Sequence, residues 1–267
     1  MPPPAGSCGG RALDRQSKRR NFEVLKATGL THKGTVRAQN QDVFRLKVLG
    51  ESLGYAMVCD GMGGEKAGDI ASLATIEMID RYLKKGLTPQ LPLNSVRSLI
   101  MTAVSAANAV VYEQAQKDER FHGMGTTLVM AIVSGQTLHI CHVGDSRIYL
   151  VHGGETLQLT KDHSMVQMLV DKGELSQSEA DTHPKKHYIT RAIGVAPRVE
   201  PDYAEYPFGQ GQVLLLCSDG LSNYLPQEQV AEEVMKCVRQ HSAAPLIDYA
   251  LAAGGADNVT AVILTDE

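Results

Sequence analysis

Tyr55-Ala56-Met57-Val58-Cys59-Asp60-Gly61-Met62-Gly63-Gly64 is an apolar run that ends on an aspartate beside a glycine. Because consecutive residues of the run are apolar, it predicts a strand that is buried on both faces. The end of such a strand is where a side chain first reaches water or a ligand. Asp60 would supply hard carboxylate oxygens there, and Gly61 would let the backbone approach a bound ion closely.

Aspartates also stand at the edges of other predicted strands. The apolar run 213–218 leads into Asp219-Gly220, and the run 138–143 leads into Gly144-Asp145. Asp42 opens the run Asp42-Val43-Phe44, and Asp257 precedes the apolar residues 259–264. Aspartates gathered at strand edges are typical oxygen ligands for hard cations. Together with Asp60, these residues indicate a site for more than one divalent cation.

Asp-Gly is also the most common dipeptide of two-residue hairpin turns, because both residues tolerate positive φ. Each Asp-Gly pair taken alone is compatible with a turn. A hairpin needs a second alternating strand directly after the turn, however. Asp60-Gly61 is followed by a glycine-rich stretch and a helical pattern, and Asp219-Gly220 by Leu221-Ser222-Asn223. The sequence therefore favours the metal interpretation over the turn interpretation.

Composition limits the classes of function. The chain has 267 residues, enough for one large domain or two small ones, and 43% of them are hydrophobic. A net charge of −4 and a pI near 6.1 argue against a nucleic-acid-binding surface. The five cysteines include no CxxC pair, no apolar run approaches the roughly 18 residues of a membrane span, and no signal peptide is evident. We expect a cytoplasmic protein that binds neither nucleic acid nor membrane.

The first 20 residues differ in composition from the rest. They are rich in proline and basic residues, and we expect a disordered tail over 1–20 followed by a single domain over 21–267. Within the domain, strand patterns and helix patterns come in blocks, and Gly135-Gln136 and Gly153-Gly154 are typical of hairpin connections. Predicted strands cover 22–28, 42–48, 53–59, 126–134, 137–143, 146–151, 155–159, 203–207, 212–217 and 259–264.

Amphipathic patterns predict helices over 66–84 and 95–115, with Asn94 as the N-cap of the second. Two more helices are predicted, one starting at Pro226 and one over about 244–253. Pairs of helices between blocks of antiparallel strands indicate an α+β fold. We expect a four-layer αββα sandwich, in which two largely antiparallel sheets pack together and helices cover each outer face.

The polar stretch from about 164 to 190 interrupts this pattern with short helical pieces. It lies next to acid-bearing strand edges, which favours a surface flap. An ordinary helical connection is equally consistent with the sequence.

The order of the motifs identifies a family. Gly34 to Asp42, Val58 to Gly64, Gly123 to Thr127, Val143 to Arg147, Cys217 to Gly220 and Asp257 to Thr260 follow one another along the chain. This ordered set resembles the metal-dependent, type 2C serine/threonine protein phosphatases, and the Asp-Gly-Met-Gly-Gly form is similar to their bacterial branch. The resemblance covers about residues 22–264.

The resemblance implies a binuclear Mn²⁺ or Mg²⁺ centre, with a weaker third site, that hydrolyses phosphoserine and phosphothreonine in proteins through a metal-bridging hydroxide. It implies partners that are phosphoproteins made by a cognate kinase, and we expect a monomer. The implied residues are Asp60 bridging the metals, Gly61 binding through its carbonyl, Asp219 and Asp257 as ligands, Asp42 acting through a water, Asp145 at the third site and Arg37 gripping the phosphate.

Two positions depart from common forms of the family. Gln41 replaces a frequent glutamate and adds no charge, and Met62 replaces a histidine of eukaryotic members and cannot donate a proton. His163 is a candidate donor, although a bystander among nine histidines is the simpler interpretation. A phosphoprotein-binding pseudoenzyme or another two-metal hydrolase, such as a nuclease, remain alternatives. The intact set of acids and the acidic charge balance weigh against them.

Overall fold

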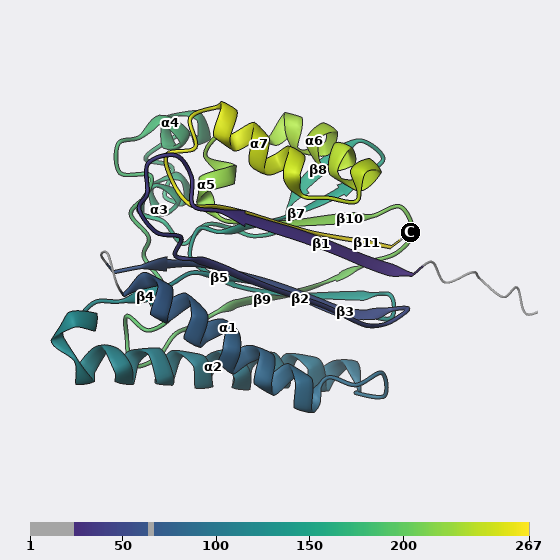
Figure 1. The fold of residues 1–267 in the computed structure, drawn as a ribbon, viewed down its shortest axis with the longest axis horizontal. Coiled ribbons are helices and arrows are strands. Elements are labelled where there is room, and N and C mark those ends of the chain that lie inside the picture. Colours follow the sequence, from purple (N-terminus) through teal and green to yellow (C-terminus); the bar gives the residue numbers. More distant parts are fainter. Residues whose placement is uncertain (1–23, 64–66, 267) are drawn as a thin grey trace, which may run out of the picture.

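The computed structural model describes residues 24–63 and 67–266. The predicted tail over 1–20 lies outside the described residues. The described chain forms four layers, with two β-sheets packed face to face and a pair of helices on each outer side (Figure 1). This is the predicted four-layer α+β sandwich, and the paired strands in both sheets are antiparallel.

The first sheet brings both ends of the described chain together. Its strand order is β1-β11-β10-β7-β8, so the last strand lies between the first strand and the middle of the sheet. The strands are β1 (Leu25–His32), β11 (Val259–Asp266), β10 (Val213–Cys217), β7 (Arg147–His152) and β8 (Glu155–Gln158). The β7–β8 hairpin turns at Gly153-Gly154, as predicted.

The second sheet has the order β2-β3-β5-β6-β9, and a short strand β4 pairs with β3. The strands are β2 (Asp42–Gly50), β3 (Leu53–Met62), β4 (Gly125–Thr126), β5 (Leu128–Ser134), β6 (Thr137–Val143) and β9 (Asp202–Pro207). The turn between β5 and β6 contains Gly135-Gln136, as predicted.

The apolar run of β3 is buried on both faces because the two faces belong to different cores. Tyr55, Met57 and Cys59 pack under the helices, whereas Ala56 and Val58 pack between the sheets. β10 behaves in the same way, with alternate residues under the opposite helix pair and between the sheets. Side chains that alternate across a strand thus fill two adjacent layers of core. Of the described cysteines, none forms a disulfide.

Helices α1 (Gly68–Gly86) and α2 (Leu93–Lys117) cover the second sheet, and α6 (Gln227–Gln240) and α7 (Ala244–Ala252) cover the first (Figure 1). Short helices complete the fold: η1 (Glu119–Phe121), α3 (Met165–Asp171), α4 (Gln177–Thr182) and α5 (Asp219–Ser222). By length and composition alone, α2 could span a membrane, whereas no apolar run of that length was expected from the sequence. In this fold one face of α2 packs into the core through Val96, Ile100 and Val104.

Several sequence predictions about element bounds were wrong. The first strand, predicted to end at residue 28, continues to His32. Asn94 is not the N-cap of α2, since the helix begins at Leu93 and the extended Pro92 occupies the cap position. The predicted strand 126–134 divides between β4 and β5 at Thr127, whose hydroxyl accepts the N–H of Asp60 and interrupts the ladder. The strand predicted over 53–59 continues to Met62, because β4 supplies a further partner.

Candidate metal centre and phosphate cleft

A cleft of about 1120 Å³ opens at one end of the sandwich. Its walls come from segments that are far apart in the sequence: the loop before β2, the end of β3, the turn after β6, the stretch before β9, the start of α5 and the loop before β11. Of the residues predicted from the sequence, those that line it are Arg37, Asp60, Gly61, Asp145, Asp219 and Asp257. Asp42 is absent from the lining because it lies buried, at 4% exposure.

The end of β3 holds Asp60 and Gly61 rigidly. The backbone carbonyl of Asp60 accepts hydrogen bonds from the Thr127 N–H at 2.9 Å and the Thr126 hydroxyl at 2.8 Å. Gly61 donates its N–H to the Gln41 carbonyl at 3.2 Å. A Cβ at position 61 would lie 2.1 Å from the Gly68 carbonyl oxygen, so only glycine fits between β3 and α1.

Asp42 begins β2 directly opposite Asp60 in the register of the second sheet. Its Oδ2 accepts hydrogen bonds from the hydroxyls of Ser218 and Thr260, both at 2.7 Å, and so ties the two sheets together. Its Oδ1 is buried without a hydrogen-bond partner among the described residues. Burial raises the pKa of Asp42 to about 7, although the two hydroxyls oppose the shift. A buried carboxylate oxygen without a partner is suited to orient a water or accept an ionic ligand.

The turn after β6 places Asp145 in the cleft. Gly144 adopts φ +104°, and a Cβ there would lie 2.6 Å from the Thr127 side chain. The hydroxyls of Thr127 and Ser146 are 2.8 Å apart, which joins this turn to the end of β3. Burial raises the pKa of Asp145 well above its ordinary value, with repulsion from Asp219 adding to the shift.

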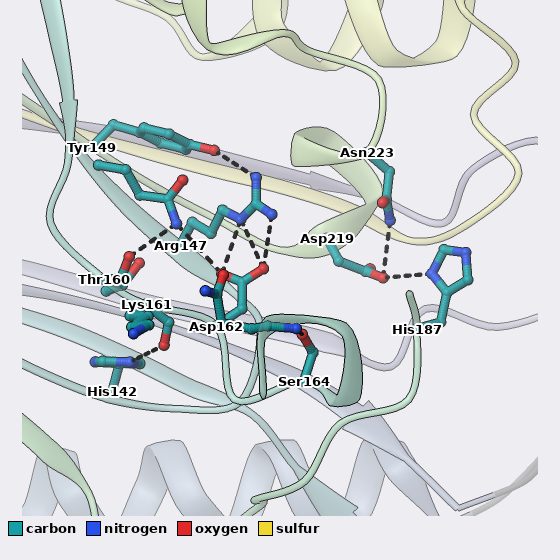
Figure 2. Close-up of polar contacts among 12 residues, drawn as sticks. His142, Arg147, Tyr149, Thr160, Lys161, Asp162, Ser164, His187, Asp219 and Asn223 are labelled. Atoms are coloured by element: carbon teal, nitrogen blue, oxygen red, sulfur yellow. Dashed lines mark hydrogen bonds and ion pairs between the residues drawn. The ribbon is translucent and has the colours of Figure 1, made fainter. Parts of the chain in front are cut away.

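Asp219 stands at the first position of α5, where the helix begins directly after β10. Its Oδ2 accepts a hydrogen bond from the Asn223 side chain at 3.1 Å and lies 3.7 Å from His187 Nδ1 (Figure 2). His187 comes from the segment that precedes β9, and contact with Asp219 raises its pKa. The carboxylate therefore lies between α5 and the predicted flap.

Arg37 and Asp257 form an ion pair in the lining of the cleft. Arg37 Nη2 donates to Asp257 Oδ2 at 2.8 Å, and both side chains are exposed to solvent. Asn258 organises the loop that carries Arg37, since its amide donates to the carbonyls of Lys33 and Gln39. Arg37 lines a cleft whose other walls carry carboxylates.

Burial, with repulsion from neighbouring carboxylates, raises the pKa of two acids that line the cleft, Asp60 and Asp145. Burial raises the pKa of Asp60 well above its ordinary value, followed by repulsion from Asp42, Asp219, Asp145 and Asp257. Such a group of carboxylates is stabilised when cations lie between them. The all-oxygen donor set and the unpartnered Oδ1 of Asp42 fit hard divalent cations.

Sequence reasoning missed several residues of the cleft. Its lining also includes Thr127, Lys186, His187, Asn223, Tyr224 and Asn258. The position of residues 164–190 beside the acids was predicted, and Lys186, His187 and Ile189 do line the cleft. His163 does not line it. Its side chain is buried at 6% exposure and faces Asp202, so the structure does not support it as a proton donor to substrate.

The family described as protein phosphatase 2C matches residues 29–252 of the chain. The chain belongs to the protein phosphatase 2C family. It is similar to the serine/threonine phosphatase Stp of Listeria innocua, with 37% identity over 239 residues that cover 88% of this chain and 93% of Stp. The predicted family and enzyme class, a serine/threonine protein phosphatase related to bacterial enzymes, are confirmed.

Solved phosphatase structures share the fold. The crystal structure of the Mycobacterium tuberculosis serine/threonine phosphatase PstP matches with a TM-score of 0.82 and 35% identity, covering 91% of this chain and 99% of that one. A structure of the PstP catalytic domain in complex with two manganese ions matches with a TM-score of 0.78 and 34% identity, covering 91% and 98%. The predicted four-layer fold is therefore confirmed by comparison as well as by topology.

Proposed function

We propose that this 2C-type phosphatase uses Asp60, the Gly61 carbonyl, Asp219 and Asp257 to hold two divalent cations, Mn²⁺ or Mg²⁺. Asp42 would act through a water, and Asp145 would complete a weaker third site. The manganese-bound PstP relative supports the metal and the number. When bound, such cations activate water for attack on phosphorus and neutralise charge on the phosphoryl oxygens.

The observation that carries this proposal is the convergence of the carboxylates with Arg37 in one cleft. Arg37 would bind two phosphate oxygens through its planar fork, a geometry that a lysine lacks. Asp42, anchored by Ser218 and Thr260, would orient water with its unpartnered Oδ1. The rigid strand ends hold these groups in place before substrate arrives, which removes the cost of orienting them.

We propose phosphoserine and phosphothreonine proteins, made by a cognate kinase, as substrates. The serine/threonine phosphatases to which the chain is similar support this substrate class. A monomeric, cytoplasmic enzyme is part of the same proposal and rests on composition: an acidic charge balance and five cysteines with no CxxC pair. Residues 164–190 would contribute to substrate choice, because Lys186 and His187 stand at the cleft.

Turnover of a phosphothreonine peptide and of p-nitrophenyl phosphate tests the proposal. Activity should require added Mn²⁺ or Mg²⁺, stop with chelator, and disappear in Asp60→Ala and Asp219→Ala. Glu155→Ala, at the exposed far end of the first sheet, is the matched control and should keep full activity. Undiminished turnover in Asp60→Ala would overturn the proposal.

A further inference from the structure

Two hydrogen bonds join the segment 160–164 to the turn that carries Asp145. His163 Nδ1 accepts the N–H of Gly144 at 3.1 Å, and the backbone N–H of His163 donates to the Gly144 carbonyl at 2.9 Å. The backbone N–H and the carbonyl of Gly144, the residue directly before Asp145, are therefore both hydrogen-bonded to His163. A backbone turn held at its N–H and its carbonyl has little freedom to rotate.

Neighbouring residues of the segment bind the chain on each side of the same turn (Figure 2). Asp162 forms a two-pronged ion pair with Arg147, with Nε–Oδ1 at 3.0 Å and Nη2–Oδ2 at 2.7 Å. The Lys161 carbonyl accepts a hydrogen bond from His142 Nε2 at 2.9 Å. His142 precedes the turn and Arg147 follows it, so segment 160–164 spans the turn completely.

The same segment is one stem of the flap. The Thr190 N–H donates to the His163 carbonyl at 2.7 Å, and the Met165 N–H donates to the Tyr188 carbonyl at 2.8 Å. The chain that enters the flap thus runs antiparallel to the chain that leaves it. Lys186, His187 and Ile189, which line the cleft, lie at the end of the outgoing stem. His163 contacts the flap through its backbone and the Asp145 turn through its side chain.

The environment of His163 keeps its imidazole neutral. The ring is buried, stacks on His142 with centroids 4.6 Å apart, and places Nε2 3.4 Å from Asp202 Oδ2. Burial, His142 and Arg191 lower the pKa of His163 to about 4. Because Nδ1 accepts a hydrogen bond, the neutral ring carries its hydrogen on Nε2. The ring can therefore serve as a permanent acceptor for Gly144 at neutral pH.

His142, His163 and Asp202 also form a group of metal-ligand type, with ligand atoms within 4.8 Å of one another. In neutral His163, however, Nδ1 accepts from Gly144 and Nε2 carries the hydrogen, so neither nitrogen offers a free lone pair to a cation. Arg191 already pairs with Asp202 at 2.7 Å. The cluster is better suited to support the turn than to hold a cation.

We propose that His163 is a positioning residue that joins the flap stem to the Asp145 turn, so that the flap and the Asp145 carboxylate keep a fixed relation across the cleft. The role of Asp145 in cation binding is part of the proposed function, and this inference rests on it. Supporting residues around a metal ligand commonly change metal affinity by about 10–100-fold when they are replaced.

Mn²⁺ binding to the full chain, followed by the electron paramagnetic resonance of free Mn²⁺, tests the role without using turnover. His163→Leu should weaken the weakest binding step by about 10-fold, as expected for loss of such support. His163→Asn, whose side-chain oxygen can accept from Gly144, should recover most of that affinity. His163→Leu added to Asp145→Asn should cause no further loss. His152→Leu, an exposed histidine on β7, is the matched control.

Hydrogen exchange supplies a second readout. In His163→Leu, amides of 143–147 and of 187–191 should exchange faster together, whereas Asp145→Asn should leave both unchanged. Wild-type Mn²⁺ binding in His163→Leu, or a loss that adds to that of Asp145→Asn, would overturn the inference. So would faster exchange in only one of the two segments. Failure of the proposed function shows separately, as turnover that persists in Asp60→Ala.

Discussion

Arg37 Nη2 lies 2.8 Å from Asp257 Oδ2, and 220 positions of sequence separate the two residues. The pair joins the loop before β2 to the loop before β11. Exposed ion pairs contribute little to stability, because solvent screens them and ordering long side chains costs entropy. We therefore expect the contact to orient the guanidinium at the cleft more than to stabilise the fold.

Replacing Arg37 should impair substrate binding without unfolding the protein. Hydrogen bonds to charged groups contribute about 1.5–3 kcal/mol each, so losing the two bonds of the fork in Arg37→Ala should lower kcat/KM by roughly 10²–10⁴-fold. Arg37→Lys should recover little of it, since a lysine keeps the charge but loses the fork. Steady-state kinetics with a phosphopeptide measure kcat/KM of both variants, and thermal unfolding measures their stability. An Arg37→Lys enzyme as active as the wild type would contradict the phosphate role.

Asp42 should make the stability of the metal-free protein depend on pH. Its pKa is about 7 in the fold, against an ordinary value of 3.8, because burial disfavours the charged form. Between these values the folded state holds the proton and the unfolded state does not, so stability falls as pH rises through this window. Asp42→Asn lacks this charge.

With chelator present, the free energy of unfolding of Asp42→Asn should therefore rise relative to that of the wild type as pH increases from about 4 to 7. Above this range the gap between the two free energies should stay constant. Chemical denaturation at several pH values measures the gap. Added Mn²⁺ should shrink it, because cations favour the ionised carboxylate. A gap that is constant across this range would show that Asp42 does not titrate as the structure implies.

Gly61→Ala should be destabilising and should weaken cation binding. The new Cβ would lie 2.1 Å from the Gly68 carbonyl oxygen, so β3 and α1 must separate. Overpacking of this kind costs typically 1–3 kcal/mol. Gly209→Ala is the control, since its Cβ would meet nothing within 4 Å. Thermal unfolding and Mn²⁺ titration of both variants give the comparison, and equal behaviour would show that the approach of β3 to α1 is not tight.

Lys186→Ala should change the preference among phosphopeptides more than turnover of p-nitrophenyl phosphate. Lys186 lines the cleft from the flap, where it can contact residues that flank the phosphate, whereas a small aryl phosphate does not extend that far. Lys172→Ala, on the exposed side of the flap, is the matched control. Equal loss on both substrates in Lys186→Ala would indicate a role in holding the cleft instead.

The four layers could be predicted from the sequence because a strand that is buried on both faces carries apolar residues at consecutive positions. The apolar run of β3 alternates between two cores, and no strand exposed on one face would carry such a run. The positions of the strand-end aspartates could also be predicted, since a polar residue beside an apolar run indicates where a buried strand reaches solvent. The exception was Asp42, whose burial depends on hydroxyls from Ser218 and Thr260, residues more than 170 positions away.

The missed residues share a cause. His187 and Asn223 reach the cleft through tertiary contacts with Asp219, and neither belongs to a periodic pattern or a local motif. The support that His163 gives to Gly144 likewise depends on how the 160–164 segment folds back on β6. The predictions of helix caps and strand bounds were wrong where a tertiary contact outweighed the local conformational preference of the residue, as at Thr127.

The position of β11 bears on how the enzyme is made. β11 lies between β1 and β10, and the loop just before it carries Asp257. During synthesis, β1 emerges from the ribosome long before its partner exists. A nascent chain that stops short of residue 257 lacks both the strand that completes the first sheet and one wall of the cleft. We therefore expect phosphatase activity to begin only after the chain has been translated through β11.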